Sequence, residues 1–127
     1  MLDTDSVSYA IRGVGKVGER IVEQKPSDLC ISAITLAELR FGVERRKSRK
    51  LEQAVAAFLS DIAVLPFDDV CAVTFGRIGA KLAEAGEPIG EADTMIAAHA
   101  LTLGLTLVTN NEKHVRRAAG LKIVSWV

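Results

Sequence analysis

Residues 29–46 read LCISAITLAELRFGVERR, a short apolar run that passes directly into a segment with the spacing of a helix. The run at 29–32 follows Asp28, as a buried strand often follows a polar residue, and apolar residues recur at helical intervals over 33–46. A strand that leads straight into a helix is the repeating unit of a parallel sheet with helices packed on it. The stretch therefore predicts an α/β fold.

The same alternation continues on both sides of this stretch. Further short apolar or β-branched runs occupy 63–66, 105–108 and 122–125, and MLD at 1–3 has the form of the end of another strand. Helical spacing covers 49–62, 69–86 and 91–103, the last of which is closed by Gly104. The length of 127 residues suits one domain. We expect a single domain over residues 1–127, in which a short, mostly parallel sheet carries helices on both faces.

Composition excludes several classes of protein. Sixteen Lys and Arg balance sixteen Asp and Glu, so no protein-wide basic field attracts nucleic acid. Cys30 and Cys71 are far apart and belong to no metal-binding or redox motif, which predicts two reduced thiols in a cytoplasmic protein. No signal peptide is evident, and no apolar stretch reaches the roughly 18 residues that a membrane helix requires, so we expect no membrane association.

The segment 13–18 imitates the G-x-G-x-x-G motif of dinucleotide-binding proteins, and residues 7–11 before it alternate as a strand would. The context does not fit, because Pro26 limits the following helix to roughly two turns. Asp28 also stands before the next strand rather than after it. We therefore interpret these glycines as the connection between two short helices.

Three carboxylates occupy positions that call for an explanation. Asp3 follows the first apolar run and is suited to cap the next helix. Glu38 shares a helical face with Ile34 and Phe41, which places it on or beside the apolar stripe, where a charge is costly unless an Arg or another polar group receives it. Asp93 lies in the first turn of the 91–103 helix, where the helix dipole favours a negative charge.

The neighbours of Asp93 at helical spacing are Ile96, Ala97 and Ala100, so we expect Asp93 to lie along the buried face as well. Three carboxylates directed inward would repel one another unless they share a cation. An oxygen-only ligand set favours Mg²⁺ or Mn²⁺ over zinc. His99 is predicted to be a packed, hydrogen-bonded histidine rather than a ligand.

Four motifs, in this order, carry a resemblance to a known family: LDTD at 2–5, SAITLAELRFG at 32–42, PIGxxDxxIAAHA at 88–100 and LVTNN at 107–111. Together they resemble the PIN-domain ribonucleases, and most closely the VapC toxins of bacterial VapBC toxin–antitoxin pairs. The resemblance implies an α/β sandwich that cleaves RNA endonucleolytically with Mg²⁺ or Mn²⁺. It also implies a homodimer that a VapB-type antitoxin silences, with DNA bound only through the antitoxin.

The resemblance also assigns residues to the expected site. Asp3, Glu38 and Asp93 match the catalytic, metal-binding acids, with Asp3 and Asp93 as the principal ligands and Glu38 binding directly or through water. The polar residues expected at the edge of the cleft are Thr4, Thr109, Asn110 and Asn111.

Two departures from the family pattern are visible. Only Met1 and Leu2 precede the first acid, so we expect either a very short first strand or a start site that lies upstream. A fourth acid is often found after the TNN stretch, whereas His114 stands there and Glu112 is in a different register. We expect His114 to be a bystander or a phosphate contact, with any second metal ion bound weakly.

Contacts to RNA are predicted from a local basic run and a second small patch, with a solvated surface as the alternative. The residues proposed for RNA binding are Arg45, Arg46, Lys47 and Arg116. Two other functions remain open at this stage. One is a non-catalytic binding module for an antitoxin and DNA, and the other is a phosphatase with an Asp nucleophile, for which Asp3 and Asp5 have the required spacing.

Overall fold

A computed structural model, which describes residues 1–126, places a small parallel sheet at the centre of the molecule. Strand β1 (Cys30–Ser32) pairs with β2 (Ala63–Leu65), and β3 (Leu107–Val108) pairs with β4 (Ile123–Val124). Leu2 joins the two pairs because it bridges Ile31 on one side and Val108 on the other, both in parallel. The resulting order across the sheet is β2, β1, Leu2, β3, β4.

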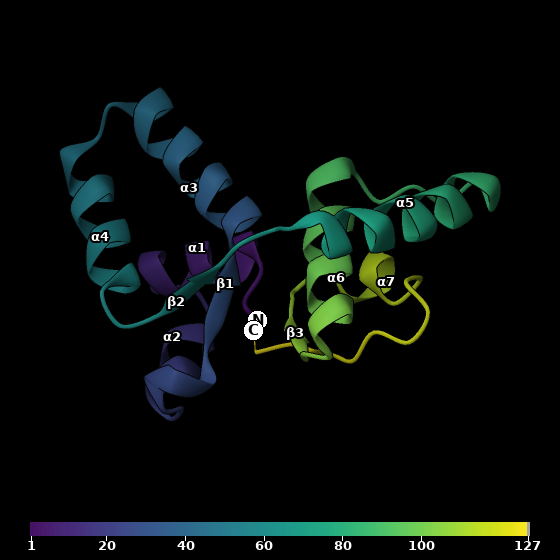
Figure 1. The fold of residues 1–127 in the computed structure, drawn as a ribbon. Coiled ribbons are helices and arrows are strands. Elements are labelled where there is room, and N and C mark those ends of the chain that lie inside the picture. The colour runs from purple at the N-terminus through teal and green to yellow at the C-terminus, as the bar shows by residue number, and fades with distance from the viewer. Residues whose placement is uncertain (127) are drawn as a thin grey trace.

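The helices lie on both faces of this sheet, as Figure 1 shows. One face carries α1 (Thr4–Arg12), α2 (Val17–Val22), α3 (Ala33–Arg46) and α4 (Arg49–Leu59), with a 3₁₀ turn at Pro26–Asp28. The other face carries α5 (Asp69–Glu84), α6 (Glu91–Leu103) and α7 (Glu112–Val115). The predicted α/β fold, with helices on both faces of a short parallel sheet, is confirmed. Within residues 1–126, no helix is long and apolar enough to cross a membrane.

The central strands supply side chains to two separate cores, because alternate residues point to opposite faces of a sheet, whereas β2 supplies only Leu65 to one of them. The core beneath α1–α4 contains Leu2, Ile31 and Val108, and the core beneath α5 and α6 contains Met1 and Leu107 with Ile123 packed against it. A strand of two residues can therefore contribute to both cores, because one of its side chains points to each face of the sheet.

Several predicted boundaries change in the structure. The helices at 33–46 and 91–103 have the predicted bounds, whereas 49–62 ends at Leu59 and 69–86 ends at Glu84. The strands are shorter than the apolar runs. Leu105, for example, donates its N–H to Ala100 to close α6, so it does not join the sheet. Helix α7 was not predicted, since four residues carry too little periodicity.

The glycine-rich segment 13–18 connects two short helices, as predicted. Gly13 ends α1 with a left-handed backbone (φ 69°), and Gly15 adopts a similar conformation (φ 63°), although Gly18 lies inside α2. Residues 7–11, which alternate like a strand, are helical, because their place after the Asp3 cap starts α1. The strand that a dinucleotide site requires is therefore absent from this segment.

Leu2→Ala tests the central place of the first strand. Leu2 is 0% exposed and lies between β1 and β3, so we expect its truncation to lower the free energy of unfolding by about 2–5 kcal/mol. Urea denaturation measures this loss, with Leu103→Ala as the control, because Leu103 is 47% exposed at the end of α6 and should cost less than about 1 kcal/mol. Equal losses in the two variants would contradict the proposed role of Leu2.

Candidate active site at the carboxyl edge of the sheet

Three polar residues follow three adjacent strands at the same edge of the sheet. Asp3 follows Leu2, Ser32 ends β1, and Thr109 follows β3, and all three are buried. Because the strands are parallel, their carboxyl ends meet at one edge, which is where α/β proteins commonly place their binding sites. This edge is the candidate functional site.

Asp3 is fixed from several directions. Its carboxylate accepts the Ser6 N–H at 2.8 Å as the N-cap of α1, and its own N–H donates to the Val108 carbonyl at 3.0 Å. The side chain is buried (6% exposed), and this burial raises the pKa of Asp3, partly offset by hydrogen bonds from Thr109 and Ser6. Asp3 therefore caps α1, as predicted, and its carboxylate is poorly solvated at the edge of the sheet.

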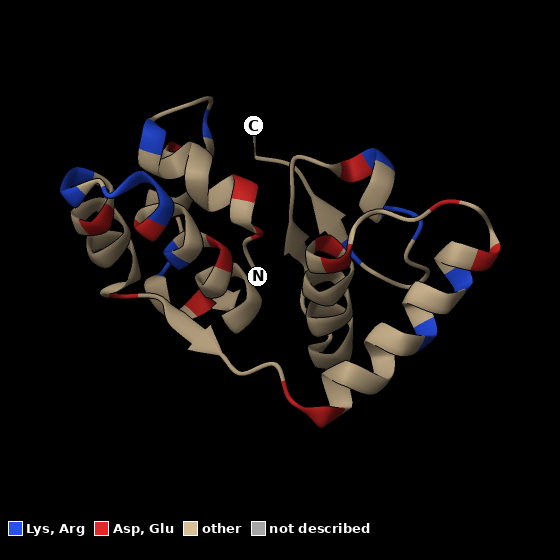
Figure 2. Cartoon of the chain, turned by 90° about the horizontal axis from the view of Figure 1, so that it is seen from above, with Lys and Arg blue, Asp and Glu red and all other residues tan. Residues whose placement is uncertain are grey.

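Asp93 is half-buried in the first turn of α6, and its predicted neighbours Ile96, Ala97 and Ala100 are buried. Burial raises the pKa of Asp93, and the negative charges of Asp3, Glu38 and Asp5 raise it further, while His114 acts in the opposite direction. Carboxylates beside α1 and on α3 thus act on Asp93 across this edge of the sheet. Figure 2 shows acidic positions on helices on both sides of the sheet.

Glu38 does not point into the core, and this prediction was wrong. The buried face of α3 consists of Thr35, Leu39 and Val43, one residue away from the predicted stripe, and Phe41 is 66% exposed. The Glu38 side chain is exposed, and its carboxylate accepts a hydrogen bond from the Thr4 hydroxyl rather than from an Arg. Glu38 therefore approaches the site from the solvent side.

The three predicted acids face one region but are not drawn together. Within residues 1–126, no group of three His, Cys, Asp or Glu side chains stands close enough to form a ready-made metal cluster. Carboxylates without a cation between them repel one another, which opposes a closer cluster. The hydrogen bond to Thr4 also keeps Glu38 on its own side of the site.

Three of the four residues predicted to edge the cleft, Thr109, Asn110 and Asn111, lie in the segment that follows β3. The Thr109 hydroxyl accepts the Asn111 N–H at 3.0 Å, and Asn110 donates to the Tyr9 hydroxyl at 3.2 Å. The side-chain oxygen Oδ1 of Asn111 lies 2.6 Å from Nδ1 of His114, which is exposed. Asn110 therefore joins the segment after β3 to α1 by a hydrogen bond. The same segment places His114 where its charge acts on Asp93.

The predicted basic run spans the last turn of α3 and the turn that joins it to α4. Arg45, Arg46 and Lys47 are exposed, and so are the neighbouring Arg49 and Lys50 at the start of α4. Figure 2 shows this turn at the end of the molecule away from α5. In the second patch Arg116 is exposed, whereas Arg117 pairs with Glu87 at 3.4 Å.

His99 is packed and hydrogen-bonded, as predicted. It is buried, its Nδ1 lies 2.8 Å from the Ser32 hydroxyl, and its ring meets that of Phe67 edge to face. Burial lowers the pKa of His99. The contact joins the start of α3 to α6, the two helices that carry Glu38 and Asp93. The role of Ser32 was missed from sequence, because no pattern along the chain links positions so far apart.

The PIN domain family matches residues 1–121 of this sequence. The chain belongs to the PIN-domain family. The tRNA(fMet)-specific endonuclease VapC of Salmonella typhimurium is 38% identical over 127 residues, which cover 99% of this chain and 96% of the relative. Ribonuclease VapC2 of Haemophilus influenzae is 38% identical over 128 residues, which cover 100% and 97%.

Solved structures agree with this assignment. DNA-bound VapBC from Salmonella typhimurium superposes with a TM-score of 0.88 at 40% identity, covering 100% of this chain and 97% of that chain. VapBC2 from Rickettsia felis, bound to a DNA fragment from its promoter, gives a TM-score of 0.87 at 35% identity, covering 100% and 98%. The similarity extends over the whole PIN domain and is not confined to the four motifs.

Asp93→Asn tests the electrostatic cost of the site. Because the folded pKa of Asp93 lies above the unfolded value of about 3.9, the folded state binds the proton more tightly, and stability falls as pH rises through the folded pKa. Asp93→Asn carries no charge at this position, so its stability does not fall as the wild-type carboxylate ionises. We therefore expect Asp93→Asn to be more stable than the wild type at pH 7 and to lose that advantage below about pH 4.

Urea unfolding at both pH values in EDTA measures the difference. Glu91→Gln is the control, since Glu91 is an exposed carboxylate in the same helical turn. An Asp93→Asn variant less stable than the wild type at pH 7 would show that the carboxylate is satisfied without a cation.

Proposed function

We propose that this PIN-domain protein is a divalent-metal-dependent endoribonuclease and the toxin of a toxin–antitoxin pair. The observation that carries the proposal is that Asp3, Glu38 and Asp93 face one region at the carboxyl edge of the sheet, where the first two act electrostatically on the third, in a chain similar to VapC ribonucleases over its full length. A non-catalytic binding module would have no need for a half-buried Asp93 whose negative charge is opposed by Asp3 and Glu38. The PIN match likewise favours a nuclease over a phosphatase.

The donor set fits Mg²⁺ or Mn²⁺. Asp3 and Asp93 are poorly solvated carboxylates whose repulsion a hard cation would relieve, and their oxygen atoms are the ligands that such cations prefer. Asp3 and Asp93 would hold the ion, with Glu38 binding directly or through water. When bound, Mg²⁺ supplies a Lewis acid for a phosphate oxygen and lowers the pKa of a bound water.

The chain itself contributes placement and charge. Ser6 and Thr109 hold the Asp3 carboxylate in one orientation, so its geometry is set before substrate arrives. The Thr4 hydroxyl holds Glu38 from the opposite side. His114, held through Nδ1 by Asn111, is available to contact a phosphate where other family members often carry an acid. The exposed run at Arg45, Arg46 and Lys47 provides charge for the RNA backbone, and Arg116 adds to it.

Partners and substrate follow from the relatives. We propose a VapB-type antitoxin as the inhibitor, since VapBC complexes are structural neighbours of this chain, with DNA contacted through the antitoxin and the toxin present as a homodimer. The name of the Salmonella relative makes tRNA(fMet) the first RNA to test. The place of action would be the cytoplasm, where RNA is present and Cys30 and Cys71 stay reduced.

Substitution of the acids should abolish cleavage without unfolding the protein. Asp3→Asn, Glu38→Gln and Asp93→Asn each remove ligand charge and keep the side-chain shape, so we expect RNA cleavage to fall at least about a thousandfold. Gel-based cleavage of a tRNA(fMet) transcript measures the rate, and Glu84→Gln on the exposed side of α5 is the control. A variant that retains near-wild-type cleavage would remove its residue from the site.

Metal removal gives a separate test. We expect EDTA to stop cleavage, Mg²⁺ or Mn²⁺ to restore it, and circular dichroism to stay unchanged, because a core of this size folds without metal. Added Mg²⁺ should raise the melting temperature of the wild type by mass action, and it should have little effect on Asp93→Asn. Undiminished cleavage in excess chelator would overturn the metal-dependent mechanism.

A further inference from the structure

A pocket of about 160 Å³ opens next to Glu38, between α1, α3 and α4. Its walls are apolar and consist of Ile11, Leu39, Leu51 and Val55. Its rim is polar and carries both signs of charge, from Arg12 and Arg46 and from Asp5 and Glu38. Thr4 and Glu38 belong both to this pocket and to the proposed cleavage site, so the two are contiguous.

Gly42 lines this pocket and contributes no side chain to it. It lies in the interior of α3, where glycine is the least favourable residue after proline, and it lines the pocket. Its backbone is not in the left-handed region, and a Cβ added to it would meet no atom within 4 Å. Neither backbone conformation nor close packing therefore requires glycine here. What glycine provides at this position is empty space beside Glu38.

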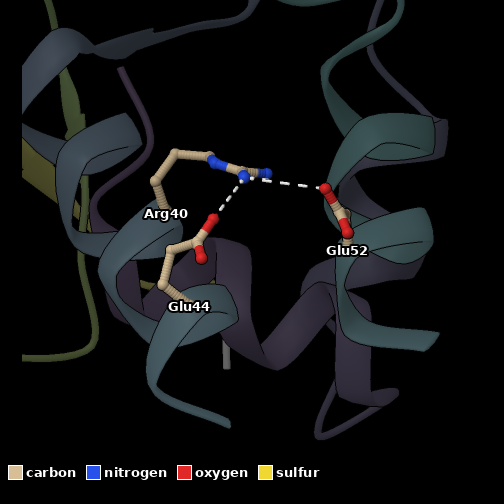
Figure 3. Close-up of polar contacts among 3 residues, drawn as sticks. All are labelled: Arg40, Glu44 and Glu52. Carbon is tan, nitrogen blue, oxygen red and sulfur yellow. Dashed lines mark hydrogen bonds and ion pairs between the residues drawn. The ribbon is translucent and has the colours of Figure 1, made fainter. Parts of the chain in front are cut away.

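The wall between α3 and α4 is held by ion pairs outside the pocket. Arg40 on α3 contacts Glu44 at 3.1 Å on its own helix and Glu52 on α4 at 3.6 Å, as Figure 3 shows. Arg40 is thereby engaged with carboxylates. Arg12 and Arg46 are the guanidinium groups that remain at the rim, since no ion pair within residues 1–126 includes them.

We propose that this pocket binds one unpaired nucleobase of the RNA substrate, from a nucleotide adjacent to the scissile phosphate. This inference rests on the proposed function. The volume equals that of about five water molecules, which suits a single planar base rather than a length of chain. Apolar walls suit the faces of the base, and a rim with guanidinium donors and carboxylate acceptors suits its hydrogen-bonding edge.

The position of the pocket favours RNA over a protein side chain as its occupant. A base seated beside Glu38 belongs to the strand that is cut there, and Arg12 and Arg46 can then contact its phosphates. Unstacked bases are the part of RNA that proteins read most readily. The pocket thus selects for an unpaired nucleotide at the cut, and Gly42 determines that selection by leaving room for it.

The test fills the pocket with Gly42→Leu and uses Gly76→Leu as the matched control. Gly76 also lies in a helix interior, on α5 at the opposite face of the sheet, and a Cβ there also meets nothing within 4 Å. Both substitutions improve helix propensity, so both variants should keep the wild-type circular dichroism spectrum and melt no lower than the wild type. The site of cleavage in tRNA(fMet) is first mapped with the wild type.

A synthetic RNA strand covering the mapped site is then made in natural form and with an abasic residue on either side of the cut. We expect Gly42→Leu to raise KM for the natural strand about tenfold or more, and Gly76→Leu to leave KM unchanged. The wild type should show a similar rise in KM with one of the two abasic strands. Gly42→Leu should show little further loss on that strand, because both changes remove the same contact.

An unchanged KM in Gly42→Leu, or equal cleavage of all three strands by the wild type, would overturn the proposal. An unchanged KM combined with weaker binding of the antitoxin would assign the pocket to a protein side chain instead. These failures differ from failure of the proposed function, in which the wild type cuts no RNA or Asp93→Asn cuts as well as the wild type.

Discussion

The structure depends on the parallel pairing of Leu2 with both Ile31 and Val108. Leu2 donates its N–H to Cys30, and Asp3 donates to Val108, so two residues at the start of the chain join two halves of a sheet. The same pairing places Asp3 beside Thr109, between the helices that carry Glu38 and Asp93. The same backbone pairing therefore completes the sheet and positions the site, and the very short first strand is sufficient for both.

The site is formed at a cost to the fold. Burial raises the pKa of Asp3 and Asp93, and neighbouring carboxylates raise the pKa of Asp93 further. A protein selected only for stability would replace these groups, whereas under the proposed function a bound cation would gain affinity from relieving their repulsion. Gly42 is a second position where a residue unfavourable for stability lies at the site: glycine lowers the stability of α3 and leaves space beside Glu38.

Much of the site could be predicted along the chain because its residues occupy positions with local meaning. Asp3 is a helix cap after a strand, and Asp93 lies in the first turn of a helix whose apolar spacing is plain. Glu38 was placed correctly in its helix but on the wrong face, because α3 is apolar over more than one stripe and only packing selects Thr35, Leu39 and Val43 as the buried one. Phe41 is exposed for the same reason.

The sequence by itself determined the alternation of strands and helices, the parallel sheet and the positions of the three acids within their elements, since these depend on local spacing and capping. Tertiary structure alone decided the strand order, the contact of Ser32 with His99, the attachment of Asn110 to Tyr9, and the pocket beside Gly42. Each of these joins residues far apart in the chain or on different helices. Periodicity describes which face a residue shares within its own element, but only the packed fold determines which other element meets that face.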